Sequence, residues 1–174
     1  MKDDILIPAI WPVPPPEPAG RPTLLRLPHA GPRVMARAAT REAARTILGA
    51  WCGHPIGLRE TPCGPRPDGV AATRGFRVSF SYVGTEAWIA FHVGPVGLDA
   101  CAIADFPERA ELARLYLTET SDDLPVEVFA RSWARLEANL KYRERSLSEH
   151  ARVAAPRQAR DWTESGVALA VAWD

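Results

Sequence analysis

The sequence predicts an α+β fold in which an antiparallel sheet packs on a long helix. Three strand-like apolar runs follow one another at residues 76–81, 86–93 and 96–103. A helical seam then runs from residue 125 to about residue 147, and a last apolar run closes the chain at residues 166–173. Because the strands are grouped in the sequence and do not alternate with helices, an antiparallel sheet is the simplest arrangement.

The length and the charge balance limit the classes of protein and partner. A chain of 174 residues is one ordinary domain or two small lobes that share a core. Lysine plus arginine and aspartate plus glutamate number 21 each, so the formal net charge is +0. This balance gives no general attraction for nucleic acid or for an acidic membrane surface, and we expect neither as a partner. Any anionic ligand must be held by a local cluster of basic side chains.

The cysteines and the N-terminal composition bear on the compartment. Cys52, Cys63 and Cys101 have no C-x-x-C spacing and no histidine at the spacing of a metal ligand. An odd number of cysteines without a pairing pattern favours a reducing compartment, so we expect a cytoplasmic protein. The apolar stretch at residues 5–13 is interrupted by two prolines, which argues against a signal peptide or a membrane span.

The first 32 residues are expected to form a short strand and a proline-rich connector, and residues 33–174 are expected to form the domain. The strand would occupy residues 5–13. A run of prolines between residues 12 and 18 favours an extended polyproline conformation, which is typical of a connector.

A helix with a basic outer face is predicted at residues 33–51, with Gly53 as its stop signal. Small and apolar side chains recur there at three- and four-residue steps: Met35, Ala39, Ala43, Ile47 and Ala50. A ridge of arginines recurs at four-residue steps: Arg33, Arg37, Arg41 and Arg45. We interpret this ridge as a solvated helix face, and the alternative is a surface for a phosphate or an acidic partner.

A half-buried strand is predicted at residues 76–81, after a loop rich in proline and glycine at residues 62–69. Its apolar and polar side chains alternate between two faces: Phe76, Val78 and Phe80, and Arg77, Ser79 and Ser81. Gly94 and Pro95 separate the next two strands, which predicts a hairpin between them.

Two helices are predicted in the second half of the chain, a short one at residues 108–117 and a longer one from Pro125 to about Leu147. The apolar seam of the longer helix is interpreted as core: Val126, Phe129, Trp133, Leu136 and Leu140.

Two carboxylates and one lysine are the candidates for chemistry. Asp99 lies at the end of an apolar run, and Glu137 and Lys141 lie one helical turn apart on the long helix. An acid at a strand end that faces an acid on a helix offers the oxygen ligands that Mg²⁺ prefers, and a lysine neutralises phosphate charge. Taken alone, the same residues also fit a turn-capping aspartate and a solvated i,i+4 ion pair.

Four segments in order carry a resemblance to a known family. They are R-P at residues 66–67, F-R-V-S-F-S at 76–81, V-G-L-D at 96–99 and F-A-R-S-W-A-R-L-E-A-N-L-K at 129–141. From about residue 33 onward, the chain resembles the 4'-phosphopantetheinyl transferases of the surfactin type. Members of that family show G-K-P, F-N-x-S-H-S, G-[VI]-D-[IL]-E and W-x-x-K-E-[AS]-x-x-K at similar separations.

The resemblance implies an α+β fold of two similar lobes, with coenzyme A in the cleft between them and Mg²⁺ on its pyrophosphate. The implied reaction moves the phosphopantetheine arm onto a serine of an acyl or peptidyl carrier protein and releases 3',5'-adenosine bisphosphate. The N-terminal lobe would be shortened relative to the family, which leaves room for completion by a second chain and hence for a homo-oligomer.

The resemblance also implies roles for five residues. Asp99 falls on the metal-binding aspartate of the family, and Glu137 falls on its second metal ligand and proposed base. Lys141 falls on a catalytic lysine that faces the phosphates. Arg66 and Ser79 fall on positions that border the nucleotide phosphates, where an arginine binds phosphate with its planar fork. Without the resemblance, Arg66 would be interpreted as surface and Ser79 as an ordinary strand residue.

Three departures from the family motifs define the alternative function. Phe80 replaces the histidine of S-H-S, Cys101 replaces the second acid of D-[IL]-E, and Leu136 replaces the lysine of K-E. Each change removes a polar contact with the cofactor, because a phenyl ring does not bind phosphate and a thiol is a poor ligand for Mg²⁺. The alternative is a relative without catalysis that binds coenzyme A, a carrier protein or a partner subunit. An unrelated α+β protein is the third interpretation.

Overall fold

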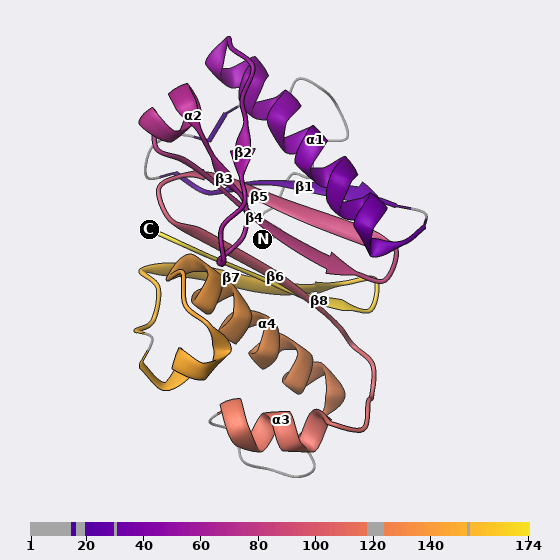
Figure 1. Cartoon of the computed structure of the whole chain (residues 1–174). Helices are drawn as coiled ribbons and strands as arrows, with labels where there is room; N and C mark the ends of the chain where they lie inside the picture. Colours follow the sequence, from indigo (N-terminus) through magenta and orange to yellow (C-terminus); the bar gives the residue numbers. More distant parts are fainter. Residues whose placement is uncertain (1–14, 17–19, 30, 118–123, 153) are drawn as a thin grey trace, which may run out of the picture.

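The chain is built from two units of the same design, each made of a strand, a long helix and a β-hairpin (Figure 1). The computed structural model describes residues 15–16, 20–29, 31–117, 124–152 and 154–174. The elements of the first unit are β1 (Thr23–Pro28), α1 (Arg33–Cys52), β4 (Phe76–Val83) and β5 (Glu86–Val93). Those of the second are β6 (Val96–Ala102), α4 (Val126–Tyr142), β7 (Gln158–Glu164) and β8 (Val167–Trp173).

The two sheets have the same strand order. In each unit the first strand pairs with the last strand of the hairpin, which gives the orders β1-β5-β4 and β6-β8-β7. All pairs in both sheets are antiparallel. The α+β class and the antiparallel pairing predicted from the sequence are therefore confirmed.

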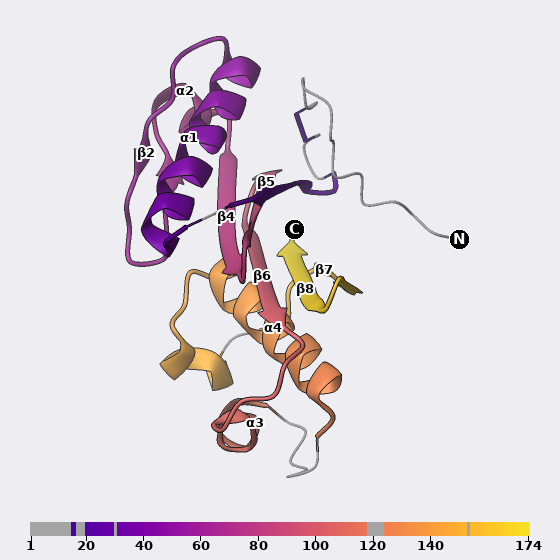
Figure 2. The ribbon, with the colours of Figure 1, turned by 90° about the vertical axis from the view of Figure 1, so that its right-hand side faces the viewer.

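Three apolar clusters hold the layers together. One lies between α1 and the outer face of the first sheet, where Leu48, Val78 and Phe91 meet. A second lies between the two sheets and contains Trp88 and Leu169. A third is made largely of alanines between α4 and the second sheet. In Figure 1, α1 lies above the strands and α4 lies below them, and Figure 2 shows the same two halves from the side.

Smaller elements fill the connections. The link from α1 to β4 contains the short strands β2 (Leu58–Arg59) and β3 (Arg66–Pro67) and the helix α2 (Gly69–Thr73). The link from β6 to α4 contains α3 (Arg109–Tyr116), and a 3-10 helix, η1 (Leu147–Arg152), precedes β7. None of the helices in the described residues is long and apolar enough to span a membrane.

Strand β1 corrects the expected division of the chain at residue 33. It lies in the segment expected to be a connector, yet it pairs with β5 over its whole length. The first sheet therefore has as many strands as the second. The shortened N-terminal lobe was expected relative to the family and stays a prediction. The strand expected at residues 5–13 lies outside the described residues, as does most of the proline run.

The hairpin predicted at Gly94 and Pro95 is wrong, because β5 and β6 belong to different sheets. Gly94 has a φ of 113°, which only glycine adopts without strain, and its N–H donates to the carbonyl of Gly75. The pair therefore carries the chain from one unit to the other. The second hairpin is formed by β7 and β8, which are joined by a tight turn with positive φ at Ser165 and Gly166.

Helix α4 differs from its predicted length and packing face. Its buried positions include three alanines at four-residue steps, Ala130, Ala134 and Ala138, while Trp133 and Leu136 are only half-buried. Small side chains let the helix lie close to the sheet. The helix ends at Tyr142 and not at Leu147, because the chain turns with a φ of 55° at Glu144. Helices α1 and α3 match their predictions to within one residue at every boundary.

Candidate functional site

The site lies where the edge strands of the two units meet. Strand β6 presents backbone N–H groups on its outer edge, and the serines of β4 accept them: Leu98 N–H donates to Ser79 Oγ (2.9 Å) and Ala100 N–H donates to Ser81 Oγ (3.0 Å). An edge strand leaves such groups unpaired, so the serine hydroxyls complete the hydrogen bonding of β6. The polar face of β4 is therefore buried against β6, whereas the sequence pattern predicts a half-buried strand.

Gly97 brings α4 into contact with β6. A Cβ atom at this position would lie 1.9 Å from the carbonyl oxygen of Ala138 and 2.4 Å from the backbone nitrogen of Tyr142. Helix α4 therefore rests on β6 with its backbone, and no side chain fits between them. This close approach places Glu137 and Lys141 beside Asp99.

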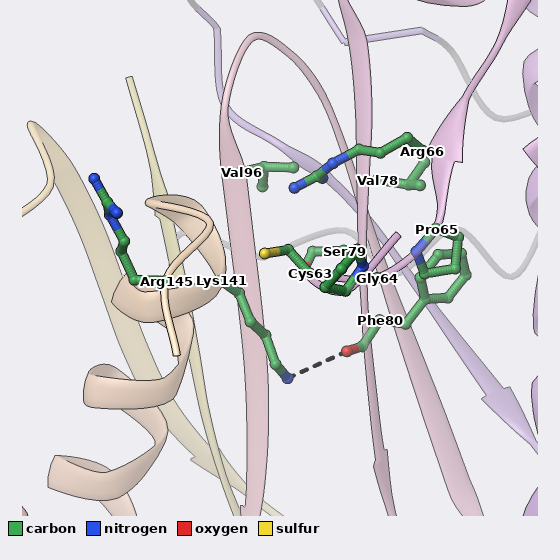
Figure 3. Close-up of a pocket in the computed structure, with 11 residues that line it drawn as sticks. Cys63, Gly64, Pro65, Arg66, Val78, Ser79, Phe80, Val96, Lys141 and Arg145 are labelled. Carbon is green, nitrogen blue, oxygen red and sulfur yellow. Dashed lines mark hydrogen bonds between the residues drawn. The ribbon is translucent and has the colours of Figure 1, made fainter. Parts of the chain in front are cut away.

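Lys141 joins β4, β6 and α4 through its ammonium group. Its Nζ donates to the carbonyls of Phe80 (3.3 Å) and Leu98 (3.0 Å) and to Asp99 Oδ1 (2.6 Å). These three bonds use all three N–H donors of the ammonium. Figure 3 shows the side chain pointing at the Phe80 carbonyl. The i,i+4 ion pair with Glu137, which was the alternative interpretation, is not formed, because the carboxylate that Lys141 contacts is Asp99.

Asp99 lies within β6 and is not a turn-capping residue at a strand end. It pairs in register with Ala170 of β8 and is buried. Its Oδ1 accepts hydrogen bonds from Ser81 Oγ (2.9 Å) and from Lys141. The structure therefore brings the three predicted residues Asp99, Glu137 and Lys141 together, with Ser81 as a fourth member that the sequence did not single out.

Glu137 is the free carboxylate of the group. It is half-buried, and within the described part of the chain no residue donates a hydrogen bond to it. Burial, followed by the nearby charge of Asp99, raises the pKa of Glu137, and Lys141 offsets part of this effect. A carboxyl group that holds its proton more firmly than usual and lacks a partner is suited to proton transfer.

The raised pKa of Glu137 predicts a pH-dependent effect on stability. The folded state binds the proton more tightly than the unfolded chain, so ionising Glu137 costs free energy only in the folded state. The free energy of unfolding of the wild type should fall relative to that of Glu137→Gln as pH rises from about 4, near the ordinary pKa of glutamate, toward neutrality. Urea denaturation of both proteins across this range measures the difference. A difference that is constant with pH would contradict the assigned environment.

A cavity of about 570 Å³ opens beside this group of residues. Asp99, Glu137 and Lys141 line it, together with Arg33, Arg37 and Arg41 of α1. Arg41 pairs with Glu60 (2.5 Å) and also lies over the Phe80 ring. Three arginines of the predicted ridge therefore line a cavity. Arg33 and Arg37 remain exposed, as the solvated-face interpretation predicts, while Arg45 is half-buried and pairs with Glu42 on the same helix.

A second cavity of about 260 Å³ adjoins the first (Figure 3). Arg66, Ser79 and Lys141 line it, and Lys141 and Phe80 border both cavities. Arg66 forms an ion pair with Glu144 (2.8 Å), which lies two residues beyond the end of α4. The predicted phosphate-bordering residues thus share a cavity, although the Ser79 hydroxyl is already bonded to β6.

The donors at the junction fit a cation that is shared with a phosphate ligand. Asp99 and Glu137 offer oxygen atoms, and the described residues contain no group of three or more histidine, cysteine, aspartate or glutamate side chains that could hold a metal. Burial, and then the charge of Asp99, raises the pKa of the Cys101 thiol to about 11, and a thiol is in any case a poor ligand for Mg²⁺. Mg²⁺ is commonly bound through one or two carboxylates plus substrate phosphates, which matches this set.

Two contributors to the site have weak signals in the sequence. The spacing of Ser79 and Ser81 places both hydroxyls on one face of a strand. The N–H groups from which they accept hydrogen bonds belong to a strand in another sheet. Gly97 belongs to the V-G-L-D segment, but its role is to let α4 lie directly on β6, and the sequence does not show how close the two elements lie.

Comparison with known proteins gives no assignment. No protein-family model matches the chain, and no curated protein matches it. The function therefore has to be inferred from the residues of the site.

Proposed function

We propose that the protein is a 4'-phosphopantetheinyl transferase that binds coenzyme A at the junction of its two units and transfers the phosphopantetheine arm to a serine of a carrier protein. The observation that carries this proposal is the meeting of Asp99, Glu137 and Lys141 with arginines of α1 around one cavity. The repeated β-α-β-β design is also what a two-lobed transferase of this kind requires. The unpaired cysteines support a reducing, cytoplasmic setting.

The charges around the larger cavity favour a phosphate-bearing ligand. Arg41 is neutralised by Glu60, and Lys141 is neutralised by Asp99. Arg33 and Arg37 form no ion pair within the described residues, and they face a single free carboxylate, Glu137. Arginine forks bind phosphate oxygens through paired hydrogen bonds, so this cavity suits a pyrophosphate.

The residues supply the parts of a phosphoryl-type displacement. Glu137 accepts the proton of the attacking serine hydroxyl as the serine oxygen bonds to the phosphorus that carries pantetheine. The bond from that phosphorus to 3',5'-adenosine bisphosphate breaks, and the arginines of α1 stabilise the charge on the leaving group. Mg²⁺, held by Asp99 and Glu137 together with phosphate oxygens, would neutralise the pyrophosphate. Arg66, Ser79 and Lys141 border the adjoining cavity, where the nucleotide phosphates extend.

A second candidate is a relative that binds coenzyme A, a carrier protein or a partner subunit without transfer. The observation in its favour is that Lys141 has all three donors engaged by protein atoms and that Asp99 already accepts two hydrogen bonds. The protonated thiol of Cys101 and the Phe80 ring also occupy positions where the family has polar groups. In such a protein the hydrogen bonds among Lys141, Asp99 and the backbone would only stabilise the fold.

Intact-protein mass spectrometry of apo carrier proteins separates these candidates. Several carriers are incubated with the protein, coenzyme A and Mg²⁺, and a chelator is added in the matched control. The transferase predicts a metal-dependent mass increase of one phosphopantetheine. Calorimetric binding of coenzyme A without any mass increase favours the second candidate, and the absence of both rejects the proposal.

A further inference from the structure

We propose that Lys141 is an internal cation that occupies Asp99 in the ligand-free protein, so that a divalent cation binds tightly only together with the phosphates of the ligand. This inference rests on the proposed function, because it concerns the same site. It adds a role that the resemblance does not provide: Lys141 controls access to Asp99.

The first step of the argument is the position of the ammonium group. Lys141 Nζ lies 2.6 Å from Asp99 Oδ1, which is the oxygen that also accepts the Ser81 hydroxyl. The side chains are 29% exposed for Lys141 and 11% exposed for Asp99. The ammonium is therefore a charged partner at a nearly buried carboxylate, where solvent screens the pair only in part.

The second step is that the protein alone gives a divalent cation few other ligands. Besides Asp99, the cavity is lined by the carboxylates of Glu137 and Glu60, and Glu60 is paired with Arg41. The described residues contain no group of three or more acid, histidine or cysteine side chains that could hold a metal. A divalent cation on Asp99 and Glu137 would then have the Lys141 ammonium as a close neighbour. Like charges at this separation repel strongly at a partly buried site.

The third step is that a phosphate ligand offers Lys141 another partner. Lys141 borders both cavities, so its ammonium group can reach a pyrophosphate bound in the larger cavity or a phosphate bound in the smaller one. When the ammonium moves to a phosphate oxygen, Asp99 is released, and the same phosphates supply ligands to the cation. Binding of the cation and of the phosphate ligand is thus mutually strengthening, as linkage requires.

The test measures Mn²⁺ binding to the ligand-free full chain by electron paramagnetic resonance. Wild type, Lys141→Met and Lys141→Gln are compared, and the glutamine variant keeps N–H donors near the carbonyls of Phe80 and Leu98. Both variants should bind Mn²⁺ more tightly than wild type, by about 5- to 150-fold, the usual range for coupled sites. Arg143→Met is the matched control, because it removes a positive charge from the end of the same helix without lining either cavity, and it should bind Mn²⁺ as wild type does. Circular dichroism verifies that each variant is folded.

The outcomes separate this inference from the proposed function. Equal Mn²⁺ affinity in wild type and the Lys141 variants, including no binding in any of them, overturns the inference. If neither variant folds, measurements on the wild type decide. The inference then requires that Mn²⁺ binds weakly to the ligand-free protein and that Mn²⁺ strengthens the binding of coenzyme A. A titration of Mn²⁺ into coenzyme A without protein corrects for their direct association. Mn²⁺ affinity that is unchanged by coenzyme A overturns it. Failure of wild type to bind coenzyme A rejects the proposed function, while the comparison of variants still decides the role of Lys141.

Discussion

Replacing Gly97 with alanine is expected to destabilise the protein by about 3 kcal/mol or more, at the upper end of the usual cost of overpacking. The added Cβ would lie 1.9 Å from the carbonyl oxygen of Ala138, which is backbone and has no rotamer to change. The helix must move away from β6, which also separates Lys141 from the carbonyl of Leu98 and from Asp99. Urea denaturation measures the loss in the free energy of unfolding.

Gly49→Ala is the matched control for this substitution. Gly49 lies in α1, and its added Cβ would lie 3.2 Å from the His54 carbonyl oxygen, a contact that a small shift relieves. Alanine is also favoured over glycine in a helix by about 1 kcal/mol, so the net change should be within about 1 kcal/mol. A Gly97→Ala protein as stable as Gly49→Ala would show that α4 does not rest on β6 as described.

Replacing Glu137 with glutamine is expected to lower the rate of phosphopantetheine transfer by about 10²- to 10⁴-fold, the usual contribution of a general base. Glutamine keeps the shape of the side chain but accepts no proton. The fold should be retained, because no described residue bonds to Glu137 and because its charge is unfavourable where it lies. The rate is measured from the mass of the carrier protein over time, at matched enzyme concentrations.

The control for this variant is Glu127→Gln, an exposed acid in the first turn of the same helix. It should transfer at the wild-type rate. Full activity in Glu137→Gln would remove Glu137 from the reaction, whereas equal losses in both variants would indicate a general effect of charge on α4.

The elements predicted well from the sequence are those with strong periodicity. Helix α1 has nearly its predicted bounds and ends at Gly53, whose N–H donates to the Gly49 carbonyl. Its buried face differs from the predicted stripe, because Ala36, Thr40, Ala44 and Leu48 are buried and Met35 is exposed. Strands β1 and β7 have no such signal. Strand β1 is short and lies between prolines, and β7 carries half-buried charged residues on the edge of its sheet.

The sequence predicts which residues form the candidate site, but it does not predict which hydrogen bonds they make. Asp99, Glu137 and Lys141 meet as the motif order implies, and Arg66 lies nearby. The partners of Lys141 could not be predicted, because two of its three acceptors are backbone carbonyls that the fold alone brings to it. The failed hairpin at Gly94 has a similar cause: two turn residues look alike in sequence whether they reverse a chain within one sheet or carry it to the next.

Calorimetric titration of coenzyme A into the protein tests the central claim, that the cavity between the units binds a pyrophosphate ligand. We expect one coenzyme A per chain, with competition by 3',5'-adenosine bisphosphate and none by pantetheine. Arg37→Ala should weaken binding by about tenfold or more, as expected for a lost bond to a charged group. Arg45→Ala, on the same ridge but outside the cavity, should not. No binding, or binding that is unchanged by Arg37→Ala, would contradict the account.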